Sequence, residues 1–394
     1  MPHFSPAASV VTPGVFALLE GKIRERQQRG ETVLPLQIGD TYLEPPRESR
    51  VALFQEATAN YRYGPIQGAE VLREAIAKHL GGHLSAGDQV HIGFGATHAL
   101  FSSVRSFLGH GDDVLIATPT WPLTKGVFHA AGARPVEVDV STRLLLGESF
   151  DLSAELEAKR TPETRALYIA SPNNPDGFVW PENLLRSLFA YAEKHDLWIV
   201  SDEVYRDYVY EGAHVSMLSV DPSLSRTVVI GSLSKSHALA GYRLGYAIAN
   251  AEVVRRARRV STHTGFNVPL VLQEAGARAF TGSDWIAEAR ALYKRARAQS
   301  AEILRAHGLP FVSGDGGTYH FVDLTKMLGG RPMEEMMEHL LHHGILVAPG
   351  ASTGSSYAGW VRICFTSVPL ATLTEGIHAF SVAALAFGSQ PPRE

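Results

Sequence analysis

The chain has almost no cysteine, no long apolar run and no excess of one charge. Its single cysteine, Cys364, cannot form an internal disulfide and lies in an apolar, strand-like segment. This favours a packed core residue in a reducing compartment over a nucleophile. No stretch approaches the roughly 18 consecutive apolar residues that a membrane helix requires, and the first residues lack the pattern of a signal peptide. We therefore expect a cytoplasmic protein that does not bind membranes.

The charge balance limits the possible partners. The 36 Lys and Arg residues and the 40 Asp and Glu residues give a formal net charge of -4, and the basic residues are spread along the chain. No basic patch for nucleic acid is indicated. With 394 residues, 45% of them hydrophobic, the chain is long enough to bury a large core and to form two domains.

From about residue 65 to 285, apolar strand-like runs alternate with helical patterns, as is typical of a doubly wound α/β fold. Runs that are apolar throughout indicate strands buried on both faces, so we expect a mostly parallel sheet flanked by helices. The predicted strands are 113–118, 165–170, 197–201, 227–231 and 244–249, and the predicted helices are 68–80, 97–109, 181–195 and 252–260.

The C-terminal part has a different pattern. An uninterrupted helical pattern at about 283–307 ends at a glycine and a proline, which stop helices. We expect residues 46–285 to form a large domain, and residues 1–45 with 286–394 to form a smaller α+β domain, joined by this long helix. The further elements predicted there are strands at 318–324, 345–348 and 360–366 and helices at 333–343 and 371–386.

The segment 231–245 carries the most specific chemical pattern. Lys235 is flanked by small hydroxyl residues at the end of an apolar strand, and Arg243 follows eight positions later in a glycine-bounded turn. This places an amine beside groups that bind phosphate, which is what a phosphorylated aldehyde cofactor needs. Lys235 would condense with the aldehyde, and Ser232 and Arg243 would hold the phosphate.

A glycine-rich turn points to the same kind of ligand. Residues 93–100 follow a strand-like run and open a helical pattern, so free backbone N–H groups and the helix dipole would suit a phosphate dianion. The turn lacks the third glycine of a dinucleotide-binding motif, which disfavours a nicotinamide enzyme.

Two charged residues lie at positions where a charge is unusual without a binding partner. Asp202 follows the strand at 197–201, and the carboxyl end of a parallel strand faces the crevice where ligands bind, although helix capping is an alternative. Arg362 lies inside an apolar strand, and a buried guanidinium needs an anion that no neighbouring acid provides. A structural salt bridge is the alternative for Arg362.

Taken in order from about residue 36 to 366, these segments resemble the class I and II aminotransferases of fold type I. The resemblance implies pyridoxal 5'-phosphate as cofactor, with Lys235, Asp202 and Tyr205 as catalytic residues. In that family the aspartate pairs with the pyridine nitrogen, and Asp202 would keep that nitrogen protonated. The implied cofactor-binding residues are Lys235, Gly95, Ala96, Thr97, Trp121, Asn174, Asp202, Tyr205, Ser232, Arg243 and Tyr63.

The resemblance also implies a substrate site and a partner. Gly39 and Arg362 would receive the substrate carboxylate, with Trp121 and Asn174 nearby. Tyr63 matches a tyrosine that reaches the phosphate of the other subunit, which implies a homodimer with shared active sites. Trp121 as a plain core residue is the alternative to its stacking on the cofactor ring.

The sequence departs from the family pattern at three positions. Ser171 and Asp176 replace the usual residues in the turn around Asn174, and His237 stands where an aromatic residue is usual. We interpret His237 as a substitution of shape. His339 and His343 have the spacing of metal ligands on a helix, but no third ligand is evident, so we expect no metal site.

These residues predict an aminotransferase that moves an amino group from an L-amino acid to a 2-oxo acid. Another reaction on the same residues, such as that of a β-lyase, a cyclase or an amino acid oxidase, is the alternative, and a ligand sensor without activity is a third. Thr262 aligns with the arginine that binds a distal carboxylate in dicarboxylate-specific members. Without that cation, a neutral or aromatic amino donor is expected.

Overall fold

The computed structural model describes residues 20–54, 61–281 and 284–389. Part of the N-terminal segment predicted for the small domain, and the predicted start of the long helix at 283, lie outside these ranges.

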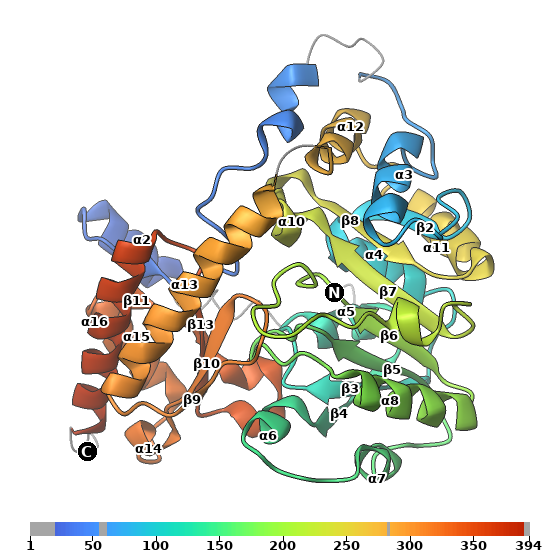
Figure 1. Cartoon of the computed structure of the whole chain (residues 1–394). Coiled ribbons are helices and arrows are strands. Elements are labelled where there is room, and N and C mark those ends of the chain that lie inside the picture. Colours follow the sequence, from blue (N-terminus) through green and yellow to red (C-terminus); the bar gives the residue numbers. More distant parts are fainter. Residues whose placement is uncertain (1–19, 55–60, 282–283, 390–394) are drawn as a thin grey trace, which may run out of the picture.

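A seven-stranded sheet forms the centre of the larger part of the molecule (Figure 1). Strands β7, β6, β5, β3 and β4 run parallel to one another, and β8 is antiparallel to both of its neighbours, β7 and β2. This confirms the predicted mostly parallel sheet. In spatial order the strands are β2 (Val90–Phe94), β8 (Leu244–Ile248), β7 (Thr227–Ser232), β6 (Trp198–Asp202), β5 (Thr164–Ala170), β3 (Asp113–Thr118) and β4 (Arg134–Asp139).

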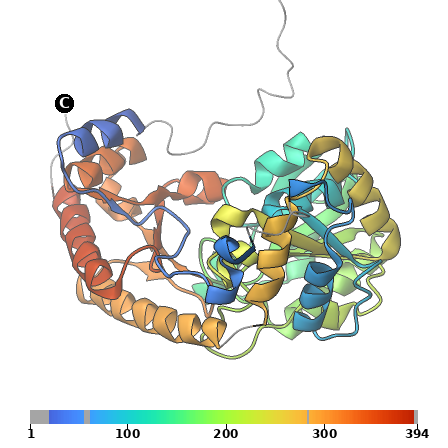
Figure 2. The same cartoon turned by 90° about the horizontal axis from the view of Figure 1, so that it is seen from above.

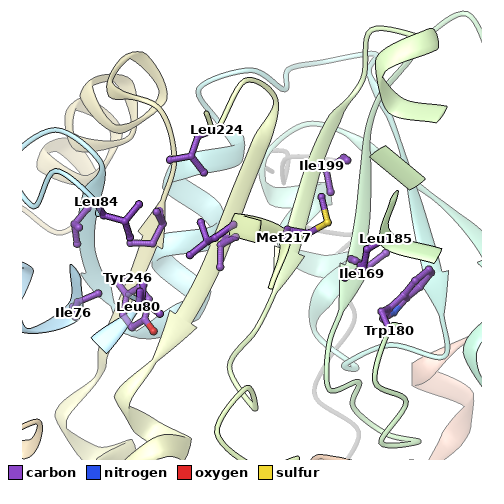
Figure 3. Packing of buried hydrophobic residues seen from close by; sticks show 14 of the residues in the cluster. Ile76, Leu80, Leu84, Ile169, Trp180, Leu185, Ile199, Met217, Leu224 and Tyr246 are labelled. Carbon is purple, nitrogen blue, oxygen red and sulfur yellow. The ribbon is translucent and has the colours of Figure 1, made fainter. Parts of the chain in front are cut away.

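Helices cover both faces of this sheet. Neighbouring residues of each strand point to opposite sides, so an apolar strand contributes side chains to a core on each face. In β3, Val114 and Ile116 join one core cluster while Leu115 joins the other. Figure 3 shows packing in the second of these clusters. The first cluster involves α4 (Gly95–Val104), α5 (Thr124–Ala130) and α11 (Ala251–Thr264); the second involves α3 (Glu70–His79), α7 (Leu152–Glu157), α8 (Glu182–Lys194), α9 (Met217–Val220) and α12 (Leu270–Ala279).

A smaller antiparallel sheet lies beside the large one, in the order β12 (Ala348–Pro349), β13 (Trp360–Cys364), β10 (Tyr319–Asp323) and β9 (Phe311–Val312). Its core includes side chains of α13 (Trp285–Ala306), α15 (Met333–His342) and α16 (Leu370–Gly388). Figure 2 shows α13 in orange and α16 in red on this side of the molecule. The predicted long helix is confirmed as α13, while the predicted domain boundaries stay a prediction. The other described elements are α2 (Glu20–Gln28), α6 (Ser141–Leu145), α10 (Leu233–Ser236), α14 (Thr325–Leu328), and the paired strands β1 (Leu34–Pro35) and β11 (Ile345–Leu346).

Within the described part of the chain, α16 is the one helix that is long and apolar enough to cross a membrane by length and composition. Its side chains Leu373, Ile377, Phe380 and Ala384 are buried in the core shared with α13 and α15. A helix that is apolar on several faces is expected where it packs in a core, so this packing accounts for its composition.

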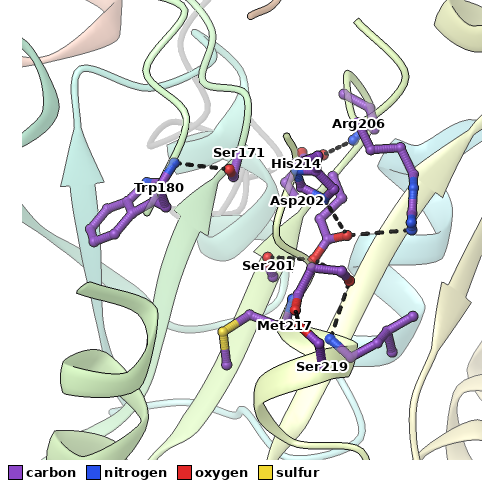
Figure 4. A network of polar contacts seen from close by, with 12 residues as sticks. Ser171, Trp180, Ser201, Asp202, Arg206, His214, Met217 and Ser219 are labelled. Carbon is purple, nitrogen blue, oxygen red and sulfur yellow. Dashed lines mark hydrogen bonds and ion pairs between the residues drawn. The ribbon is translucent and has the colours of Figure 1, made fainter. Parts of the chain in front are cut away.

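Glu203 fixes the loop that follows β6. Its carboxylate is buried and pairs with His214 at 2.9 Å and with Arg206 at 3.5 Å. Burial alone would raise the pKa of Glu203, but the charge and hydrogen bond of His214 lower it below its ordinary value. The same carboxylate accepts hydrogen bonds from Ser201, Ser216 and the backbone N–H of Met217, in the network of Figure 4.

We predict that Glu203→Gln lowers the free energy of unfolding by about 2–4 kcal/mol, because it removes a buried carboxylate that pairs with Arg206 and, when protonated, with His214. A carboxylate with a lowered pKa stabilises the fold above its ordinary pKa, and the effect is lost as the pH falls through the lowered value. The difference between variant and wild type in denaturant unfolding should therefore shrink at acidic pH. Glu252→Gln on the surface of α11 is the control, and its loss should be much smaller. Equal losses in the two variants would contradict this account of Glu203.

Candidate active site

A cavity of about 220 Å³ lies between the two sheets, where β5, β6 and β7 end. The large sheet and its connections contribute most of the lining, and β10 and β13 of the small sheet contribute Tyr319 and Arg362. The predicted site residues among the lining are Gly39, Ala96, Thr97, Trp121, Asn174, Asp202, Tyr205, Ser232, Lys235, Arg243 and Arg362. Most residues predicted from separate segments therefore meet at one place.

Lys235 is presented on α10, which begins directly after β7. Ser232 caps this short helix, since its hydroxyl accepts the N–H of Ser234 at 3.0 Å. The Lys235 amine donates to the carbonyl oxygen of Gly39, and no carboxylate within the described residues pairs with it. A Cβ at Gly39 would lie 2.0 Å from the hydroxyl of Tyr319, so a side chain at this position would displace Tyr319.

The start of α4 and Arg243 form a corner rich in hydrogen-bond donors. Gly95 has a φ of +76° and Arg243 a left-handed φ of 54°. A Cβ at Gly95 would lie 2.5 Å from a guanidinium nitrogen of Arg243, so that side chain lies directly against the helix start. A Cβ at Gly245 would lie 2.1 Å from the backbone nitrogen of Ala96. The described residues place no carboxylate on Arg243, which leaves its charge available to a phosphate.

Asp202 is the last residue of β6 and is 8% exposed. One carboxylate oxygen accepts from the hydroxyl of Tyr168 at 3.0 Å, and the other accepts from the N–H of Val204 at 3.2 Å. Burial raises the pKa of Asp202 to about 6, although both hydrogen bonds favour the ionised form. No cation contacts the carboxylate among the described residues, so it suits a cationic partner.

Arg362 is buried on β13 without a carboxylate partner in the described part of the chain. One terminal nitrogen donates to the side-chain oxygen of Asn174 at 2.9 Å, and the other donates to the carbonyl of Gln37 at 2.7 Å. Its Nε has no hydrogen-bond partner. The guanidinium also lies 4.4 Å from the ring centre of Tyr319. This buried cation needs an anion, as the sequence predicted.

Tyr205 faces Tyr319 across the cavity. Their hydroxyl groups are 2.7 Å apart and both rings are buried. Tyr168 and Tyr319 were not predicted as site residues. A strand tyrosine indicates only a buried ring, and the sequence does not say which group its hydroxyl meets.

The turn around Asn174 explains one departure from the family pattern. Asp176 is fully buried with no cation beside it among the residues that the structure describes, and burial raises its pKa. Its carboxylate instead accepts four hydrogen bonds: from the hydroxyls of Ser141 at 2.5 Å and Thr142 at 2.9 Å, from the side-chain amide of Asn173 at 2.8 Å, and from the N–H of Phe178 at 3.1 Å. Asp176 thus fixes the turn that presents Asn174.

Some singled-out residues lie away from the cavity. Tyr63 is 85% exposed and meets the ring of Phe266. His237 is buried against Phe280, and burial lowers its pKa to about 4, which agrees with a substitution of shape. Thr262 lies on α11 and does not line the cavity.

The structure also places Cys364 and His339, two further residues that the sequence singled out. Cys364 is fully buried, as predicted for a core residue. The Nε2–H of His339 donates to the carbonyl oxygen of Ala383, and His339 is partly buried on α15. Within the described residues, no group of three or more His, Cys, Asp and Glu side chains has the arrangement of a metal site.

The arrangement fits a phosphorylated pyridine aldehyde. Lys235 offers an amine, Arg243 and the start of α4 offer donors to a phosphate, and Asp202 offers a buried carboxylate to a ring cation. Trp121 lines the cavity with an aromatic ring. Arg362, which has no carboxylate partner among the described residues, suits a second anion. Fold and site together define a pyridoxal-phosphate enzyme of fold type I.

Comparisons with known proteins agree. A family model described as aminotransferase class I and II matches residues 31–380. An arginine–pyruvate transaminase of Pseudomonas aeruginosa is 33% identical over 346 residues, covering 86% of each chain. Aromatic-amino-acid aminotransferase 2 of Thermococcus litoralis is 32% identical over 360 residues, covering 88% of this chain and 90% of that protein. A solved structure of a Thermus thermophilus aspartate aminotransferase double mutant has a TM-score of 0.89 at 27% identity, covering 97% of this chain and 100% of that one.

The chain belongs to the class I and II aminotransferases. It is a transferase that depends on pyridoxal phosphate and moves an amino group from an amino acid to a 2-oxo acid.

We predict that borohydride reduction of the yellow protein fixes the cofactor on Lys235, because this amine is the one that lines the cavity. Peptide mapping of the reduced protein should find the label on Lys235. Lys235→Ala should remain unlabelled, whereas Lys294→Ala, which removes an amine of the long helix, should label normally. A label on another lysine would contradict the assignment of Lys235 as the lysine that binds the cofactor.

Proposed function

We propose that Lys235, Asp202 and Tyr205 are the catalytic residues of this aminotransferase. Pyridoxal phosphate, when bound, supplies an aldehyde that reacts with amines and a ring that accepts electrons. The amine of Lys235 would hold the aldehyde and, when it is free, would carry the proton that leaves the substrate Cα. The proximity of Lys235 to Gly39, at the edge of the substrate region, supports this role.

The other cavity residues would hold and orient the reactants. Ser232, Arg243, Gly95, Ala96 and Thr97 hold the phosphate, and their support is the donor-rich corner at the start of α4. Trp121 stacks on the ring, and Tyr205 donates to the ring oxygen together with the amide of Asn174. Arg362 and Gly39 receive the substrate α-carboxylate, as the free Nε of Arg362 supports.

Asp202 would hold the proton on the ring nitrogen. A carboxylate that is buried and lacks a cation gains most from a cationic partner, and that partner in turn stays protonated. The 8% exposure of Asp202 supports this pairing.

We predict that Asp202→Asn keeps the fold but loses most turnover, because a neutral amide cannot hold the ring nitrogen protonated. The activation barrier should rise by about 3 kcal/mol or more. Steady-state rates with thermal unfolding as the control for folding will measure this. Near-normal kcat in a folded Asp202→Asn protein would mean that the aspartate is structural only.

We further propose that the amino donor is neutral or aromatic. The observation that supports this most directly is the charge of the cavity lining: its cations are Lys235, Arg243 and Arg362, and each already has a role. His237 lies outside the lining and has a lowered pKa, so it adds no cation. A donor with a second carboxylate would leave that group unpaired in a dry site.

A screen of amino donors by single-turnover absorbance tests both the reaction and the preference. Leucine, methionine and phenylalanine should convert the cofactor to its aminated form, which should persist until a 2-oxo acid is added. Aspartate and glutamate should have at least tenfold lower kcat/KM, a gap of about 1.4 kcal/mol. A tenfold advantage for the acidic donors would reverse the interpretation of the cavity, and lasting turnover without a 2-oxo acid would contradict transamination.

The quaternary structure and location complete the proposal. We propose a cytoplasmic homodimer in which Tyr63 reaches the phosphate site of the other subunit. The ring of Phe266, which meets Tyr63, is exposed, and so are Ile66 and Val71, which follow Tyr63 in the chain; these apolar side chains support a partner surface there. The single buried cysteine supports a reducing compartment.

A further inference from the structure

Tyr168 is the buried hydroxyl that meets the carboxylate of Asp202. In the register of the sheet, Ala170 of β5 lies opposite Asp202 of β6. Tyr168 is two residues before Ala170 and therefore points to the same face, one step along the strand. Its hydroxyl lies 3.0 Å from Asp202, and it lines the same cavity. The contact thus follows from the pairing of two parallel strands.

The ring of Tyr168 is fixed by packing. The side chain is 1% exposed and lies edge to face with Phe128 at 5.6 Å. Thr120 and Thr124 are also fully buried, and their hydroxyls interact with that of Tyr168. Trp121 lies between these two threonines in the sequence and lines the cavity. The hydroxyl of Tyr168 therefore connects the carboxylate with the segment that carries this tryptophan.

The direction of the hydrogen bond is also fixed. Burial raises the pKa of Tyr168 well above its ordinary value, so the hydroxyl keeps its proton and remains a donor. Its removal would leave the backbone N–H of Val204 as the one hydrogen-bond donor to the Asp202 carboxylate among the described residues. The charged groups around this carboxylate are Glu203, which is next to it in the chain and unfavourable to its charge, and the three cations of the cavity lining, Lys235, Arg243 and Arg362.

We propose that Tyr168 is a positioning residue that holds the Asp202 carboxylate ionised and oriented towards the cofactor ring. This rests on the proposed role of Asp202. Tyr168 acts by donating to one carboxylate oxygen, which leaves the remaining lone pairs directed into the cavity. Its effect on catalysis passes entirely through Asp202.

Tyr168→Phe tests this, because it keeps the packed ring and removes only the donor. A hydrogen bond to a charged group favours the charged form, so its loss should raise the pKa of Asp202 by about one unit. Carboxyl 13C NMR of the full chain without cofactor, with Asp202→Asn for assignment, measures that pKa. In the enzyme with cofactor, the acidic limb of the kcat profile should shift to higher pH by a similar amount, with a smaller effect on KM.

Tyr210→Phe is the matched control. It also removes a buried tyrosine hydroxyl, which donates to the carbonyl of Gly317 at 2.7 Å outside the cavity lining. It should leave both the pKa of Asp202 and the pH profile unchanged. If Tyr168→Phe does not fold, Thr124→Val, which removes a neighbour of the same hydroxyl, should shift the pKa in the same direction by less.

The outcomes separate the two proposals. An Asp202 pKa in Tyr168→Phe equal to that in wild type and in Tyr210→Phe overturns the role of Tyr168. A raised pKa together with normal turnover in Asp202→Asn would instead refute the proposed role of Asp202 and leave the hydrogen bond itself established.

Discussion

The buried guanidinium of Arg362 joins three segments that are far apart in the sequence. It lies on β13, donates to Asn174 in the turn after β5, and donates to the backbone at Gln37. A buried cation cannot be left without partners, so these segments must meet for the site to exist. The Nε of Arg362 has no hydrogen-bond partner, and this free donor supports the proposal that Arg362 receives an anionic group of the substrate.

Much of the fold could be predicted because strands buried on both faces are apolar throughout. β6 and β7 match the predicted runs to within a residue. β4 was missed because it is an edge strand, where Arg134 is exposed and Glu137 and Asp139 are partly exposed and form polar contacts. An edge strand has no continuous apolar pattern by which to recognise it.

Some residues of the site could likewise be predicted from the sequence, and others could not. Residues whose chemistry is unusual for their position, such as Lys235 after a strand and Arg362 inside one, could be predicted from the sequence. Tyr168 and Tyr319 could not, because a tyrosine in a buried strand is ordinary, and what makes these two matter is the group opposite each hydroxyl. That information exists only once strand register and the approach of the two sheets are fixed.

The buried carboxylate of Asp176 limits which segments of this sequence could be replaced by those of its relatives. Its four hydrogen-bond donors come from its own turn and from α6, so the acid and the hydroxyls of Ser141 and Thr142 form one unit. Asp176→Thr alone would remove the carboxylate to which the hydroxyls of Ser141 and Thr142 donate. The turn around Asn174 and α6 therefore depend on each other. A homologous turn could replace this one only if the corresponding helix were replaced with it.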